Sequence, residues 1–155
     1  MREVKKLLKA FVYAGRGIAV CAASERNYRI HIAAVVTVVI FAVLYGVTPG
    51  EAAVLALTMA LVLGLEAVNT AVEAAVDLAS DKQSELARIA KDAAAGAVLT
   101  AAIGAVAVAV FVFGDYARLA PTLETILKYW YVALLYIAVM TVFVFVIKYK
   151  KKSER

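Results

Sequence analysis

Four long apolar runs, each ended by a short polar segment, are the feature that most constrains the fold of this chain. They cover about residues 30–48, 52–76, 93–113 and 123–147, and a helix needs about 20 such residues to cross a bilayer. In lipid, only helices and closed barrels satisfy the backbone polar groups, and barrel strands alternate polar and apolar residues. These runs do not alternate, so the sequence predicts an all-α, polytopic membrane protein.

The composition excludes several other classes of protein. The 155 residues are 65% hydrophobic and 19% charged, whereas soluble domains are closer to half apolar and a quarter charged. Cys21 is the only cysteine and His31 the only histidine, which rules out a disulfide scaffold and a zinc cluster. A hydrolase triad would have to use His31, and no nucleophile motif surrounds it.

The distribution of basic residues predicts the topology. Seven Lys and Arg residues precede the first run, three lie in the segment 78–92 and five follow the fourth run, whereas the opposite side has two, Arg118 and, near the boundary, Lys128. Because basic residues mark the cytoplasmic side, both termini and the 78–92 segment are expected there. The net charge of +5 is explained in this way, and no nucleic-acid partner is expected.

The N-terminal segment, residues 1–29, differs from the four runs. Its apolar residues recur at helical spacing between basic ones, as at Val4, Leu7, Leu8 and Phe11. This pattern is typical of an amphipathic helix that lies on a membrane surface.

The second run contains polar residues that a bilayer disfavours. An ionisable residue at the centre of a membrane helix costs about 2.5–3.5 kcal/mol, yet one face of this helix, within about 100°, carries a stripe of five polar residues: Glu66, Asn69, Thr70, Glu73 and Asp77. Carboxylate and amide oxygens suit Mg²⁺, and a carboxylate in an apolar setting suits a general base. The alternative is polar adhesion between helices, which suits Asn69 or Thr70 alone better than it suits carboxylates.

Two further polar clusters, residues 24–31 and 85–92, lie on the same predicted side, where ATP is found. Each has an ordinary interpretation. The first could be an interfacial anchor, and the second a charged helix start with an i,i+3 pair between Glu85 and Arg88. The chain has no Walker A sequence and no kinase glycine-rich loop, so a nucleotide site would need another design.

Three motifs in these clusters carry a family resemblance. They are E-R-N-Y-R-I-H at residues 25–31, E-A-V-N-T-A-V-E-A-A-V-D at 66–77 and A-K-D-A-A-A-G-A-V-L at 90–99. In type, order and spacing they resemble the prokaryotic diacylglycerol kinase and undecaprenol kinase family, over about residues 7–113. The resemblance implies a surface helix and three spanning helices, usually in a homotrimer with active sites between subunits. It also implies transfer of the γ-phosphate of MgATP to the hydroxyl of a membrane lipid.

The resemblance also implies roles for individual residues. Glu66 corresponds to the general base that faces the lipid hydroxyl, and Asn69 to the polar residue beside it. Glu25 and Glu73 correspond to the Mg²⁺ ligands. The positions that correspond to ATP-binding residues are Tyr13, Arg16, Gly17, Asp77, Lys91 and Asp92.

The chain departs from the family after the third span. Residues 1–114 form the expected kinase-like membrane domain, and residues 115–155 add a fourth span, about 123–147, with a basic cytoplasmic tail. The form of the 25–31 motif is more similar to undecaprenol kinases of Gram-positive bacteria, which favours undecaprenol over diacylglycerol. The alternatives from the residues alone are a small proton-coupled transporter using Glu66 and a noncatalytic membrane scaffold. A bacterial or archaeal cytoplasmic membrane is the expected location.

Overall fold

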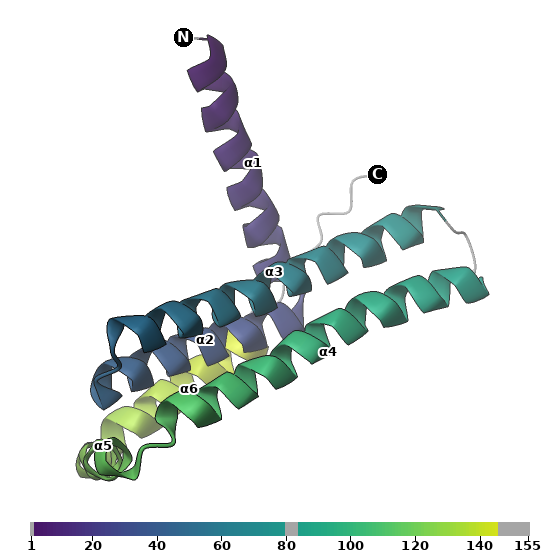
Figure 1. Cartoon of the computed structure of the whole chain (residues 1–155). Coiled ribbons are helices and arrows are strands. Elements are labelled where there is room, and N and C mark those ends of the chain that lie inside the picture. Colours follow the sequence, from purple (N-terminus) through teal and green to yellow (C-terminus); the bar gives the residue numbers. More distant parts are fainter. Residues whose placement is uncertain (1, 80–83, 146–155) are drawn as a thin grey trace.

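The computed structural model describes residues 2–79 and 84–145, and these residues form six helices without strands. The helices are α1 (Arg2–Ser24), α2 (Arg26–Tyr45), α3 (Pro49–Ala79), α4 (Glu85–Phe113), α5 (Tyr116–Lys128) and α6 (Trp130–Phe145). Helices α3 and α4 run side by side as an antiparallel hairpin, α2 and α6 pack behind them, and α1 projects away from this bundle (Figure 1). The all-α prediction is confirmed.

Several helices are long and apolar enough to cross a membrane. Helices α1 to α4 each meet that requirement, and the bent pair of α5 and α6 is a further candidate. At 1.5 Å per residue, the 31 residues of α3 extend about 46 Å, which exceeds a hydrocarbon core of about 30 Å. The hairpin therefore extends beyond the lipid, and large apolar side chains such as Leu57 and Phe111 are exposed on its surface. The chain is an integral membrane protein.

The turn between α2 and α3 follows from its sequence. Gly46 ends α2 in the left-handed region with φ 72°, which costs glycine little. Thr48 and Glu51 then form a capping box before α3: the Thr48 N–H donates to the Glu51 carboxylate over 2.7 Å and the Glu51 N–H to the Thr48 hydroxyl over 3.3 Å. Pro49 occupies the first helical position, where no N–H is needed.

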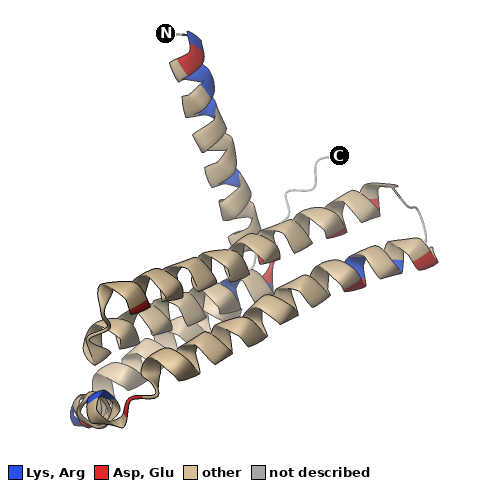
Figure 2. Cartoon of the chain, viewed as in Figure 1, with Lys and Arg blue, Asp and Glu red and all other residues tan. Residues whose placement is uncertain are grey.

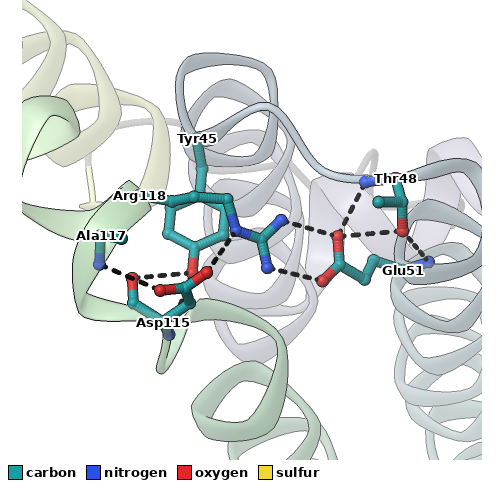
Figure 3. Close-up of polar contacts among 6 residues, drawn as sticks. All are labelled: Tyr45, Thr48, Glu51, Asp115, Ala117 and Arg118. Carbon is teal, nitrogen blue, oxygen red and sulfur yellow. Dashed lines mark hydrogen bonds and ion pairs between the residues drawn. The ribbon is translucent and has the colours of Figure 1, made fainter.

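The C-terminal segment is held at this turn by a polar cluster shown in Figure 3. The Arg118 guanidinium of α5 makes two bonds to Glu51, of 2.8 and 3.1 Å, and one of 3.2 Å to Asp115. It also lies 4.5 Å from the centre of the Tyr45 ring. Bidentate pairing of this kind is strong. Arg118, followed by the Thr48 N–H, holds the pKa of the Glu51 carboxyl at about 2, below its ordinary 4.5.

Two predicted boundaries differ from the structure. The surface helix was expected to reach residue 29, but α1 ends at Ser24 and Arg26 already belongs to α2. A continuous helix over 123–147 was also wrong, because α5 ends at Lys128 and bends by 83° from α6. The charges of Glu124 and Lys128 favour the membrane surface, whereas α6 from Trp130 onward carries no charge. The end of that predicted span, like the basic tail, lies outside the described residues.

Candidate active site

The polar stripe of α3 lies on one helix face, as the spacing predicts, and its deepest member is Glu66. The Glu66 side chain is inside the protein, with 4% of the residue exposed. The Thr70 hydroxyl donates to the Glu66 backbone carbonyl over 3.1 Å, so the hydrogen-bonding need of this hydroxyl is met within the helix. Burying a carboxylate in an apolar span lowers the stability of the protein, so a carboxylate at such a position usually has a function. This favours a catalytic role for Glu66 over helix adhesion.

Asn69 is paired with the next carboxylate of the stripe, Glu73. Its side-chain Nδ2 donates to Glu73 Oε1 over 3.0 Å, which fixes the orientation of both side chains. Asn69 Oδ1 is buried and, among the described residues, has no hydrogen-bond partner. An unpartnered buried carbonyl oxygen is unusual and costs about 1–3 kcal/mol. Asn69 Oδ1 is therefore an acceptor open to a donor group of a bound ligand.

At the outer end of the stripe, an ion pair joins α3 to α4. Lys91 Nζ of α4 donates to Asp77 Oδ1 of α3 over 2.6 Å. Both side chains are exposed, at 38% and 70%, and exposed pairs contribute little stability, typically below about 1 kcal/mol. The pair can therefore exchange for a phosphate or a metal at small cost.

Asp92, the residue after Lys91, pairs with Arg88 and not with a residue of α3. Arg88 bridges Glu85 at 2.6 Å and Asp92 at 3.0 Å along the exposed face of α4. The expected pair between Glu85 and Arg88 is thus confirmed. The sequence reasoning missed the bond from Arg88 to Asp92, although their i,i+4 spacing is a signal for it.

Glu25 lies at the corner between α1 and α2. It occupies the N-cap position of α2 in extended geometry and makes no capping bond with its side chain, so the carboxylate is available for another partner. Helices α1, α2 and α3 all contact one another, so the corner where Glu25 lies is packed beside the helix that carries the stripe.

Tyr13, Arg16 and Gly17 are not brought to this group. They are exposed on the part of α1 that projects from the bundle, and the Arg16 guanidinium lies 6.0 Å from the centre of the Tyr13 ring. Within the described part of the chain, no hydrogen bond or ion pair links them to the stripe.

The donor set suits magnesium better than a caged metal. Among residues 2–79 and 84–145, no three His, Cys, Asp or Glu side chains converge on one point. Mg²⁺ does not need such a cage, because it is commonly bound by one or two carboxylates together with water and substrate phosphates. Glu73, held by Asn69, and Glu25, whose side chain makes no capping bond, are carboxylates of the kind that such a site uses. Charged residues cluster around this region and at the α5 end, while the α4 segment 93–113 has none (Figure 2).

Fold and site together define a helical integral membrane protein with a carboxylate site that begins inside an apolar span. Residues 12–113 match the model of the prokaryotic diacylglycerol kinase family, and the chain belongs to that family. It is 40% identical over 111 residues to the undecaprenol kinase of Bacillus subtilis (strain 168), which covers 72% of this chain and 90% of that protein. No solved structure matches the chain significantly. The chain is therefore a membrane lipid kinase, and the transporter and scaffold alternatives lose their support.

Proposed function

We propose that this kinase transfers the γ-phosphate of MgATP to the hydroxyl of undecaprenol, with Glu66 as the general base. The observation that carries the proposal is the burial of Glu66 in an apolar span beside the unpartnered Asn69 Oδ1. The 40% identical relative is an undecaprenol kinase, which supports a polyprenol rather than diacylglycerol as the acceptor.

The reaction proceeds at the Glu66–Asn69 pair. The lipid hydroxyl donates its one hydrogen bond to Glu66 and accepts one from an N–H of the Asn69 amide. Its proton passes to the Glu66 carboxylate as the oxygen attacks the γ-phosphorus, and the bond from that phosphorus to ADP breaks. General-base assistance of this kind contributes about 10²–10⁴-fold to the rate. The surrounding apolar side chains exclude the water that would otherwise compete for the phosphate.

The nucleotide is held further along the stripe. Glu73, already oriented by Asn69, and Glu25 at the helix corner bind Mg²⁺, which neutralises phosphate charge when it is bound. Lys91 leaves Asp77 and pairs with the phosphates, while Asp77 and Asp92 contact the nucleotide. Positioning and charge neutralisation of this kind supply most of the catalysis in phosphoryl transfer.

The remaining ATP contacts come from Tyr13, Arg16 and Gly17. Helix α1 projects from its own bundle, so these residues can reach the polar stripe of a neighbouring subunit more directly than their own. This supports the proposal of a homotrimer with active sites between subunits. The bias of Lys and Arg toward both termini and the 78–92 segment supports a site on the cytoplasmic side.

Transfer of labelled phosphate from ATP tests the proposal. The full-length protein in mixed micelles with Mg²⁺ is offered undecaprenol and diacylglycerol in parallel. We expect label mainly in undecaprenol, and a loss of at least about 10²-fold in Glu66→Gln with ATP binding retained. The matched control is Glu124→Gln on the exposed side of α5, which should keep full activity. Near-normal turnover in Glu66→Gln would refute the base, and preferential labelling of diacylglycerol would refute the substrate.

A further inference from the structure

An apolar pocket of about 550 Å³ lies between α2, α5 and α6. Its volume is within the range of about 300–1,000 Å³ found for ligand sites. Two of its three walls come from residues beyond 113, where the family match ends. The pocket is therefore a feature of the C-terminal addition and not of the kinase domain alone.

Almost none of the surface that lines the pocket is polar. The hydroxyls of Thr37 and Tyr136 lie 2.7 Å apart and bond to each other, and Thr37 also donates to the Ala33 carbonyl over 2.7 Å. The rest of the lining is almost wholly apolar, with Phe41, Ile126 and Ala133 among its members. A ligand that fits this apolar pocket is a hydrocarbon, because a polar ligand would lose its hydrogen bonds to water and gain none from the lining.

The position of the pocket matches that of lipid chains. Helix α6 is uncharged over its 16 residues, whereas α5 is amphipathic and bent from it by 83°. When α6 follows the membrane normal, α5 lies along the surface and covers the pocket from above. From Leu44 to Thr37 the wall descends about 10 Å along α2, a third of the hydrocarbon thickness.

The basic residue Lys128 lies next to the lining residue Tyr129, beside the pocket. Lys128 Nζ lies 5.7 Å from the centre of the Tyr129 ring, and Tyr129 lines the pocket. No carboxylate of the described residues is within ion-pair distance of Lys128. At the surface of a membrane, the complementary group is the phosphate of a lipid whose chain enters the pocket below.

The pocket is separate from the site where lipid is phosphorylated. Among the described residues, none of those that line the pocket belongs to α3, the helix that carries Glu66 and Asn69. A chain in this pocket therefore lies outside the proposed catalytic stripe. We propose that the pocket binds one acyl chain of an anionic phospholipid whose phosphate pairs with Lys128, as a structural lipid distinct from the substrate.

The single tryptophan, Trp130, makes the proposal testable because it begins α6 beside Tyr129. Phosphatidylglycerol with brominated acyl chains, which quench nearby indole fluorescence, is mixed in small proportion into phosphatidylcholine vesicles that hold the full-length protein. We expect brominated phosphatidylglycerol to quench Trp130 more than random mixing of the lipids would. Brominated phosphatidylcholine should bind about fivefold more weakly, because the attraction between one lysine and an anionic lipid contributes about 1 kcal/mol.

Matched variants locate the quenching lipid. Ala133→Phe fills the pocket and should reduce quenching to the random level, with Ala133→Leu as a milder variant should the first misfold. Ala138→Phe makes the same change on α6 outside the lining and should leave quenching as it is. Lys128→Gln should abolish the preference for phosphatidylglycerol while contact with brominated chains persists.

Three results would overturn the proposal. Unchanged quenching in both Ala133 variants would show that no lipid chain enters the pocket. Relief of quenching by added undecaprenol would show that the occupant is a polyprenol. Loss of quenching together with a changed oligomeric state in Ala133→Phe, and with the same change in Ala133→Leu, would show that a second copy of the chain fills the pocket.

Discussion

Replacing Arg29 by methionine should destabilise the junction of three helices. The Arg29 side chain is buried, and its guanidinium donates to the Val144 carbonyl of α6 over 3.1 Å and to the Ala22 and Ala23 carbonyls of α1 over 3.1 and 3.2 Å. Methionine fills much of the same volume but donates nothing. One side chain thus connects the end of α1, the start of α2 and the last described turns of α6.

The size of the effect can be worked from these bonds. Hydrogen bonds to a charged group contribute about 1.5–3 kcal/mol each, and a buried carbonyl left without a donor costs about 1–3 kcal/mol. The Val144 bond is buried, while those to Ala22 and Ala23 are partly open to water and lose less. Since removal of the guanidinium also ends its own desolvation cost, we expect a net loss of about 2–4 kcal/mol in the free energy of unfolding.

Equilibrium unfolding in micelles measures this loss, and a matched variant controls for the charge. Arg26→Met removes an exposed arginine from the same turn and should stay within about 0.5 kcal/mol of the parent. Arg29→Lys keeps the charge but not the planar fork, and should lie between the two. Because Glu25 is at this corner, Arg29→Met should also raise the Mg²⁺ concentration needed for half-maximal turnover. Equal stability of Arg29→Met and Arg26→Met would refute the reasoning.

Three further predictions concern the other contacts. Acidification should release α5 from the α2–α3 turn: the pKa of Glu51 is lowered to about 2, so its pairing stabilises fully above pH 4.5 and is lost as the pH falls toward 2. The midpoint of thermal unfolding should drop over that interval in the parent and much less in Glu51→Gln; parallel curves would contradict the pairing. Gly46→Ala places a side chain at φ 72° and should cost about 1 kcal/mol, measured by the same unfolding, with Gly64→Ala, inside α3, as the control that should not destabilise. Lys91→Met should raise the KM for ATP at least about tenfold while stability changes by less than about 1 kcal/mol; a KM unchanged under saturating lipid would remove Lys91 from the phosphate site.

The helices and the stripe could be read from the sequence because they depend on local periodicity. Long apolar runs fix the helices of the bundle, and the spacing from Glu66 to Asp77 fixes their common face. Contacts between helices could not be obtained in this way. The bond between Lys91 and Asp77 depends on the register of the α3–α4 hairpin, and that of Arg29 to Val144 joins residues 115 positions apart.

The break at Tyr129 shows a second limit of hydropathy. Residues 123–147 are apolar enough on average to form one span, so the pattern alone merges α5 with α6. The structure separates them because Arg118 fixes α5 against Glu51, and the other two charges of α5, Glu124 and Lys128, favour the membrane surface. A local average cannot register an ion pair formed with a residue of another helix.

The described part of the C-terminal addition, residues 115–145, contacts the part of the chain that matches the family near its start and near its last described residues. Arg118 ties α5 to the turn that starts α3, through bidentate contacts with Glu51, and Arg29 ties the Val144 carbonyl to the corner where Glu25 lies. Between them, α6 packs along α2 with the Thr37–Tyr136 bond near its middle. Arg29 is thus the contact through which α6 reaches the corner between α1 and α2, and its bond to Val144 is buried. Disturbing the Val144 end of α6 should therefore alter the Mg²⁺ response at the Glu25 corner before it alters Asn69, whose bond to Glu73 lies within α3.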